Sequence, residues 1–355
     1  MEFVEIWKDI LLGPFTTLML GGKASFFAIC GTEEDLIAAI KFSRENLLPF
    51  RILGGGSNTI VPDHGYEGLV IKLEILGLEE ISQSDNDLLI QVGAGENWDK
   101  FVLKSLQLGL TGIECLSGIP GNVGACPIQN IGAYGQEVSE SIESIRMIDT
   151  NLKSISVSTS ECNFSYRNSR FKSGDWTQNI ITHVTFRLSK IKEINFRYPE
   201  VLKKWKDTKI ENANRFDELL SFRNLILNLR KSKSMVLDPF DANSKSVGSF
   251  FTNPFLTADE KERLEVKIKN LGLETPPFYP EQNNTFKISA AWLIENSGFR
   301  KGYVKNGVGI STAHSLALIN INGSTKSLLD LADEIKEGVR SRFNINLMIE
   351  PVILS

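Results

Sequence analysis

The sequence predicts an α+β fold in which helices and strands share two or three domains. The length of 355 residues suggests that number at roughly 150 residues per domain. Hydrophobic residues make up 42% and charged residues 23%, which is typical of a folded protein. The first and last thirds alternate strand-like and helix-like segments, whereas the middle third reads mainly as strands. We therefore expect ordered domains with buried cores.

Short strands and helices alternate along the first third of the chain. Thr32 followed by Asp35 has the spacing of a capping box, so we expect a helix to begin there. A second helix is expected at 97–108, with its apolar residues on one side, and Gly109 should end it. The expected strands lie at residues 26–30, 51–53, 69–73 and 88–92.

The middle of the chain is expected to be rich in strands between residues 142 and 188, because apolar side chains recur there at nearly every second position. Residues 189–217 are polar and highly charged, which predicts an exposed insertion. A helix at 217–230 should follow, since its apolar residues have helical spacing.

The last third returns to alternating helices and strands. Thr257 and Glu260 form a second capping-box pattern, for a helix that reaches Asn270. Ser289 is placed to cap another helix. The further expected helices cover 290–297 and 327–341, and the expected strands cover 316–321 and 345–354.

Charge and cysteine usage argue against several classes of protein. The 43 acidic and 39 basic residues leave a net charge of −4, which argues against a nucleic-acid partner. Four cysteines without a Cys-x-x-Cys pair, and three histidines, predict neither a disulfide framework nor a metal site. No segment reads as a signal peptide or a membrane span, so we expect a cytoplasmic protein without membrane insertion.

A first glycine cluster follows directly on the expected strand at 51–53. It comprises Gly54, Gly55, Gly56, Ser57 and Asn58. Successive residues that can adopt positive φ can turn their backbone N–H groups into a concave anion site. An ordinary tight turn is the alternative interpretation of this cluster.

A second and longer glycine cluster occupies residues 118–135, with five glycines and two prolines. These residues exclude a regular helix through the segment, because each interior glycine costs about 1 kcal/mol and each proline about 3 kcal/mol. The segment carries no charge, so it is too apolar for a solvated linker. We expect it to wrap a large flat ligand, although a loop that only packs on the core is an alternative. Neither cluster is a standard Rossmann or NTPase phosphate loop.

The two glycine clusters, in this order, resemble those of the UDP-N-acetylenolpyruvoylglucosamine reductase family, also called the MurB family. Further matching stretches lie at 166–172, 248–254 and 290–295, then at Gly298, Lys301 and Gly302, and finally at Leu347 and Glu350. Each stretch alone is a weak signal. Their common order along nearly the whole chain makes the resemblance specific.

The resemblance implies a two-part FAD-binding domain of the vanillyl-alcohol-oxidase or PCMH type, followed by an α/β substrate-binding domain. Subdomain 1 would cover 1–75, with the C-terminal strand 345–355 returning near it. Subdomain 2 would cover 76–230, including the insertion at 189–217, and the substrate-binding domain would cover 231–344.

The resemblance also implies the activity. A cytoplasmic, monomeric oxidoreductase would use NADPH to reduce UDP-N-acetylenolpyruvoylglucosamine to UDP-N-acetylmuramate through FAD. This is a step of peptidoglycan precursor synthesis, which serves cell-wall biogenesis, cell shape and cell division. The cofactor-binding residues implied are Gly54, Gly55, Gly56, Ser57, Asn58, Gly118, Ile119, Pro120, Gly121, Gly124, Ala125, Asn130, Gly132, Ala133, Tyr134 and Gly135.

Three residues match the family's catalytic positions. Arg167 carries a permanent charge and a fork of donors that suit the substrate carboxylate. Ser249 matches the serine that donates a proton to C2 of the enolpyruvyl group. Glu350 lies in an apolar run, where a carboxyl group either faces solvent or is desolvated and able to act as an acid. Without the resemblance, Arg167 could be a surface arginine and Ser249 a turn or cap serine.

Five residues are implied in substrate binding. They are Tyr198, Arg230, Lys233, Asn253 and His314. Lys233 and Asn253 would hold the diphosphate, and Tyr198 matches a tyrosine on a substrate-closing loop. Two alternatives on the same scaffold are a catalytically silent protein that binds a UDP-sugar or flavin, and a flavin oxidase.

Overall fold

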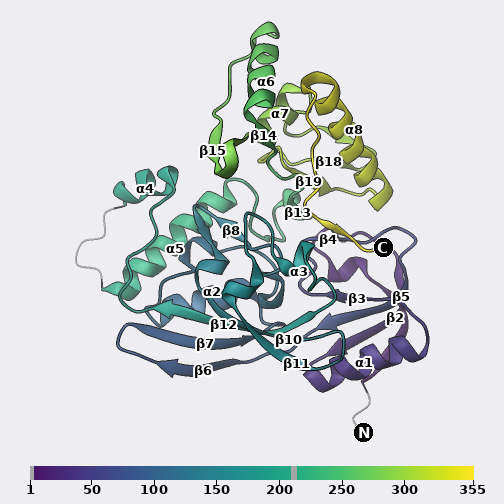
Figure 1. Cartoon of the computed structure of the whole chain (residues 1–355). Helices are drawn as coiled ribbons and strands as arrows, with labels where there is room; N and C mark the ends of the chain where they lie inside the picture. Colours follow the sequence, from purple (N-terminus) through teal and green to yellow (C-terminus); the bar gives the residue numbers. More distant parts are fainter. Residues whose placement is uncertain (1–3, 209–213) are drawn as a thin grey trace. The chain divides into compact units, whose positions relative to one another are not determined.

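The computed structural model of the protein describes residues 4–208 and 214–355 and divides into two compact units (Figure 1). Unit 1 contains the residues up to Ile10, together with Ala24–Gly56 and Tyr66–Val236. Unit 2 contains Leu11–Lys23, Ser57–Gly65 and Leu237–Ser355. Both units mix helices and strands, so the predicted α+β class is confirmed.

The first sheet of unit 1 has the strand order β1-β2-β5-β3, and β2 and β3 run parallel to β5. Helix α1 connects β2 to β3 and buries Leu36 and Ile40. Its predicted start is confirmed, because Thr32 accepts the amide of Asp35 and the Asp35 side chain closes the capping box. The bounds are β1 Ile6–Leu11, β2 Lys23–Cys30, α1 Glu33–Glu45, β3 Phe50–Leu53 and β5 Tyr66–Leu73.

The second sheet of unit 1 is antiparallel, with the order β11-β10-β12-β7-β6 (Figure 1). Helix α2 packs on it, since the rings of Phe101 and Phe186 lie 4.9 Å apart and Trp98 is fully buried beside them. The bounds are β6 Leu78–Gln83, β7 Asp87–Gly93, α2 Trp98–Gln107, β8 Gly132–Ala133, β9 Gln136–Glu137, β10 Ile142–Ile148, β11 Ser154–Ser158, α3 Arg170–Ser173 and β12 Ile180–Ser189. The sequence does not predict β6, because all six of its residues are exposed and it shows no buried face.

The segment after β12 differs from the exposed insertion that the sequence predicts. It contains helix α4, Pro199–Lys206, which packs against α5, Arg215–Lys231. The rings of Phe196 and Trp205 each make an edge contact with the ring of Phe222 on α5, and they are tilted relative to each other. The three pairs of ring centroids lie 5.5–5.9 Å apart. These aromatic residues anchor an otherwise charged segment. Residues 209–213 of the predicted insertion lie outside the described residues.

Unit 2 is built from two antiparallel sheets, with the orders β13-β19-β18-β17 and β14-β16-β15. Helices α7 and α8 pack on each other, and α8 packs on β18 and β19 (Figure 1). Thr257 and Ser289 cap α6 and α7 as predicted. The bounds are β4 Thr59–Ile60, β13 Ser246–Ser249, β14 Phe255–Thr257, α6 Ala258–Asn270, β15 Tyr279–Glu281, β16 Thr285–Lys287, α7 Ala290–Asn296, β17 Val304–Lys305, β18 Val308–Ile310, β19 Ala317–Asn320, α8 Thr325–Phe343 and β20 Val352–Ile353.

The strand predicted at 345–354 is mostly wrong. Only Val352–Ile353 forms a strand, β20, which pairs in parallel with β4. Pro351 precedes it and has no N–H to donate. Ile345 and Leu347 are buried in the core of unit 2, so their apolar character serves packing rather than strand pairing.

Candidate functional site

The glycines of the two clusters come together within unit 1, whereas Ser57 and Asn58 of the first cluster belong to unit 2. A Cβ atom built on Gly55 would lie 2.7 Å from Cα of Gly121 and 2.8 Å from Oδ1 of Asn122. Real Cβ atoms do not approach other heavy atoms so closely, so only glycine allows the two backbones to meet here. The second cluster is therefore seated directly on the first.

The second cluster is bound along the segment that leads into α2. The amide of Trp98 donates to the carbonyl of Gly121 (3.0 Å), that of Val123 to Glu96 (2.9 Å) and that of Gly124 to Ala94 (2.9 Å). The Asn122 side chain donates to the carbonyl of Gly95 at 3.0 Å. These bonds give the loop a fixed backbone course instead of the freedom of a linker.

The loop that carries Arg167 is bound to the second half of the same cluster. Arg167 adopts a positive φ of 53°, and its Nη2 donates to the carbonyl of Gly132 at 3.0 Å. Ser169 Oγ donates to the carbonyl of Ile128 at 2.7 Å. Buried Asn130 donates through Nδ2 to the carbonyl of Ser165 at 3.2 Å. The predicted catalytic arginine and the predicted cofactor loop are thus neighbours.

Tyr134 lies where the cofactor loop meets the predicted substrate residues. Its ring makes an edge contact with Tyr198 at 5.5 Å, and Lys233 Nζ lies 6.0 Å from its ring centroid. Burial raises the pKa of Tyr134 to about 12. Lys233 also forms an ion pair with Glu200 at 3.4 Å.

Arg230 lies close to this group, at the end of α5. Burial lowers the pKa of its guanidinium. Its Nη2 donates to the carbonyl of Met235 at 2.8 Å, whereas its buried Nε has no hydrogen-bond partner among the described residues. The guanidinium therefore retains an unused donor beside Tyr134 and the glycine loop.

Ser249 and Glu350 are neighbours within unit 2. Ser249 ends β13, and the amide of Glu350 donates to the carbonyl of the next residue, Phe250, at 2.9 Å. An isolated bridge pairs Phe251 with Ile349. Two segments a hundred residues apart in the sequence are thus held side by side. Arg167 belongs to unit 1, so the meeting of all three predicted catalytic residues stays a prediction.

Asn253 and His314 also lie in unit 2, and both hold local backbone. Asn253 Oδ1 accepts the amide of Ala290, the first residue of α7, at 3.0 Å. His314 Nδ1 accepts the amide of Leu316 at 3.1 Å.

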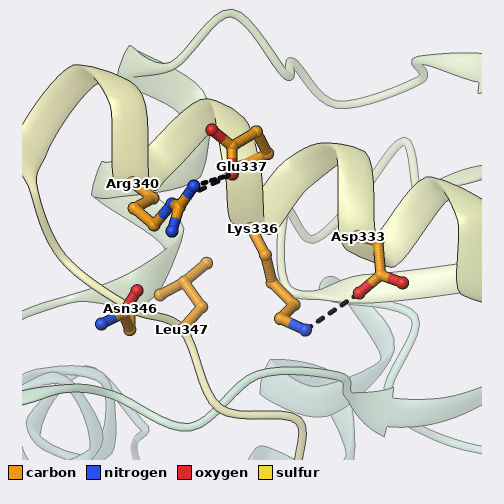
Figure 2. Close-up of a pocket in the computed structure, with 6 residues that line it drawn as sticks. All are labelled: Asp333, Lys336, Glu337, Arg340, Asn346 and Leu347. Carbon is orange, nitrogen blue, oxygen red and sulfur yellow. Dashed lines mark hydrogen bonds and ion pairs between the residues drawn. The ribbon is translucent and has the colours of Figure 1, made fainter.

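One surface pocket of unit 2 lies on α8 and contains none of the predicted site residues. Figure 2 shows its lining of Asp333, Lys336, Glu337, Arg340, Asn346 and Leu347. Lys336 pairs with Asp333 at 2.9 Å and Arg340 with Glu337 at 3.0 Å, so its charges are matched within the helix. We assign it no function.

The described part of the chain has no group of three or more His, Cys, Asp and Glu side chains that could hold a metal ion. None of its helices is long and apolar enough to cross a membrane.

Two charged residues that the sequence does not single out also reach the glycine cluster. They are Asp99 of α2 and Arg223 of α5, and Asp99 accepts the amide of Gly118. One feature of the sequence could have pointed to Arg223: it is a charged residue among the apolar residues of α5, between Phe222 and Ile226.

Comparisons with known proteins show the family to which the chain belongs. The model of the FAD binding domain matches residues 24–156, and that of the C-terminal domain of UDP-N-acetylenolpyruvoylglucosamine reductase matches 238–354. The chain is 42% identical to the UDP-N-acetylenolpyruvoylglucosamine reductase of Thermobifida fusca, over 98% of this chain and 97% of that protein. It is 39% identical to the enzyme of the same name from Streptomyces avermitilis, over 98% and 95%.

The structure is also similar to a solved one. The MurB crystal structure from Thermus caldophilus matches with a TM-score of 0.68 and 24% identity, over 99% of this chain and all of that one. The fold and the matched relatives together define an FAD-dependent oxidoreductase. The chain belongs to the UDP-N-acetylenolpyruvoylglucosamine reductase family, which confirms the resemblance seen in the sequence.

Proposed function

We propose that the protein uses NADPH to reduce UDP-N-acetylenolpyruvoylglucosamine to UDP-N-acetylmuramate, as a cytoplasmic monomer in peptidoglycan precursor synthesis. The observation that carries the proposal is the presence of Arg167, Ser249 and Glu350 in a chain 42% identical to a reductase of that name. A catalytically silent relative has no need to keep all three.

The residues of unit 1 fit FAD. The contact of Gly55 with Gly121 brings the two clusters together, and the clusters contain backbone N–H groups suited to a pyrophosphate. Bound there, FAD would carry the two electrons from NADPH to the substrate. We assign the cofactor to subdomains 1–75 and 76–230 and the substrate to 231–344.

Reduction of the enolpyruvyl group adds hydrogen to both alkene carbons and spreads negative charge from C2 into the carboxylate. Arg167 would meet this charge with its guanidinium, whose position is fixed by the bond to Gly132. Ser249 would give a proton at C2. Glu350, held beside it by the Phe250 backbone, would support that transfer.

The diphosphate of the substrate needs cations and donors. Lys233 is the proposed principal cation, and Arg230 adds a guanidinium with an unused Nε donor. Tyr198 would cover the substrate from the segment that bears α4. Asn253 and His314 would contribute from unit 2.

The test is a stopped-flow experiment on the purified, FAD-loaded protein. We expect NADPH to bleach the flavin absorbance and the enolpyruvyl nucleotide to restore it. Ser249→Ala should leave bleaching unchanged and slow the restoration by several orders of magnitude. A loaded protein that does not oxidise NADPH in the presence of the substrate would end the proposal. Rapid reoxidation by oxygen alone would indicate a flavin oxidase instead.

A further inference from the structure

Gly118, the first residue of the second glycine cluster, is held by a partly buried ion pair. Its amide donates to Oδ1 of Asp99 at 2.5 Å. Asp99 is bound in turn by both terminal nitrogens of Arg223, at 2.7 Å and 2.6 Å. The Arg223 side chain is 9% exposed and the Asp99 side chain 33% exposed, so this bidentate pair is partly shielded from water.

The backbone conformation and the neighbours of Gly118 both favour glycine at this position. Its φ is +74°, and a Cβ built on it would lie 2.7 Å from Cδ2 of Leu227 and 3.4 Å from Nε of Arg230. Arg223 and Arg230 are seven residues apart on α5, so they lie on the same side of that helix. Arg230 therefore lies beside Gly118, and Arg223 is linked to it through Asp99.

The ion pair joins helix α2, which binds the glycine cluster, to helix α5, which leads to a proposed substrate residue. Asp99 lies in the first turn of α2, next to Trp98, whose amide already binds Gly121. Arg223 lies on α5, whose C-terminal end leads into the proposed substrate residue Lys233. The pair thus fixes the start of the proposed cofactor loop relative to both helices.

We propose that Asp99 and Arg223 are positioning residues for the cofactor: their ion pair holds the Gly118 amide so that the glycine loop is already formed before FAD binds. This inference rests on the proposed role of that loop in FAD binding. A loop that is formed in advance loses less conformational entropy on binding, and the gain appears as affinity.

Two double variants isolate the hydrogen bond from the charge. Asp99→Asn with Arg223→Met removes both charges but keeps an oxygen that can accept the Gly118 amide. Asp99→Leu with Arg223→Met removes the charges and the acceptor, at nearly the same side-chain size. Neither leaves a buried charge without a partner, which is the usual cause of severe destabilisation. Glu143→Gln, which breaks the exposed bidentate pair with Arg187, controls for loss of an ion pair elsewhere.

The measurements are the FAD dissociation constant of the apoprotein, by flavin fluorescence, and hydrogen exchange of the Gly118 amide, by NMR. We expect the Asn variant and the Glu143→Gln control to bind FAD within about threefold of the wild type. The Leu variant should bind about tenfold more weakly, with faster Gly118 exchange and a lower unfolding midpoint than the Asn variant, because the Gly118 amide loses its acceptor. Equal FAD affinity of the two double variants would overturn the proposal.

A second measurement needs no variant. In the wild-type apoprotein the Gly118 amide should exchange as slowly as the amides in the middle of α2. Exchange at the rate of an open loop would refute the inference even if the Leu variant does not fold. If the wild type binds no FAD at all, the proposed function fails, whereas slow Gly118 exchange would still show that the pair orders the loop.

Discussion

Two neighbouring glycines of the first cluster differ in the space that they leave for a side chain. A Cβ on Gly55 would collide with the backbone of Gly121, whereas one on Gly54 would find its nearest neighbour at 3.9 Å. We expect Gly55→Ala to lower the free energy of unfolding of the apoprotein by about 1–3 kcal/mol, because the two loops must separate. Gly54→Ala is the matched control and should change it by less than about 1 kcal/mol. Urea unfolding of both variants measures the difference, and equal losses would contradict the close approach.

Glu114 shows how one buried side chain can join distant backbone. It is 1% exposed, and its carboxylate accepts the amides of Gly112 at 2.6 Å and Asn195 at 3.0 Å. Glu114→Ala leaves both amides without a partner, so we expect a loss of about 2–4 kcal/mol in the free energy of unfolding. Glu114→Gln keeps one acceptor oxygen and should lose about half as much. Urea denaturation decides, and an Ala variant as stable as the Gln variant would show that water replaces the carboxylate.

At the scale of single elements, α4 depends on a few aromatic contacts. Trp205 is half-buried and packs on Phe196 and Phe222. We expect Trp205→Ala to release α4 from α5 and to speed proteolytic cleavage within 197–207 about tenfold, while unit 1 remains folded. Lys203→Ala, an exposed change on the same helix, is the control. Unchanged cleavage of the Trp205 variant would mean that other contacts hold the helix.

Elements with local signals were predictable from the sequence. The capping boxes at Thr32 and Thr257 locate two helices correctly because a cap is a contact between residues three apart. Strand β6 was not predicted because all six of its residues are exposed, and helix α4 was not predicted because its aromatic contact Phe222 lies on another helix. The sequence predicts a strand over all of 345–354 because composition alone does not separate packing from pairing.

In the candidate site, too, local features were predictable and contacts between separate elements were not. Glycine clusters are visible in a sequence because positive φ and close approach restrict the residue type at each position. The contact of Gly55 with Gly121 was not predictable, nor was the pair of Asp99 with Arg223, because each depends on how separate elements pack. Sequence reasoning therefore located the loops but not the residues that fix their backbone.

At the scale of the whole molecule, the buried cysteines should make the folded protein less stable at alkaline pH. All four are buried and lie in unit 1. Burial raises the pKa of Cys30 to about 12 and that of Cys162 to about 11, and it also raises the pKa values of Cys115 and Cys126. The ordinary thiol value is 9.0, so above that pH the unfolded chain loses protons that the folded chain retains. The free energy of unfolding must therefore fall as pH rises from about 9 towards 11 or 12.

Each buried thiol should contribute a fall of about 1.4 kcal/mol per pH unit in this window. We expect the free energy of unfolding to drop steeply between pH 8 and pH 10, with Cys126→Ala lowering the size of the drop by about 1.4 kcal/mol. The cavity left by the substitution costs the same at both pH values and cancels in the comparison. Urea titrations of the two proteins at both pH values give the four free energies needed. An identical drop in both would mean that Cys126 ionises as readily in the folded chain as in the unfolded one, which its complete enclosure in the core of unit 1 argues against.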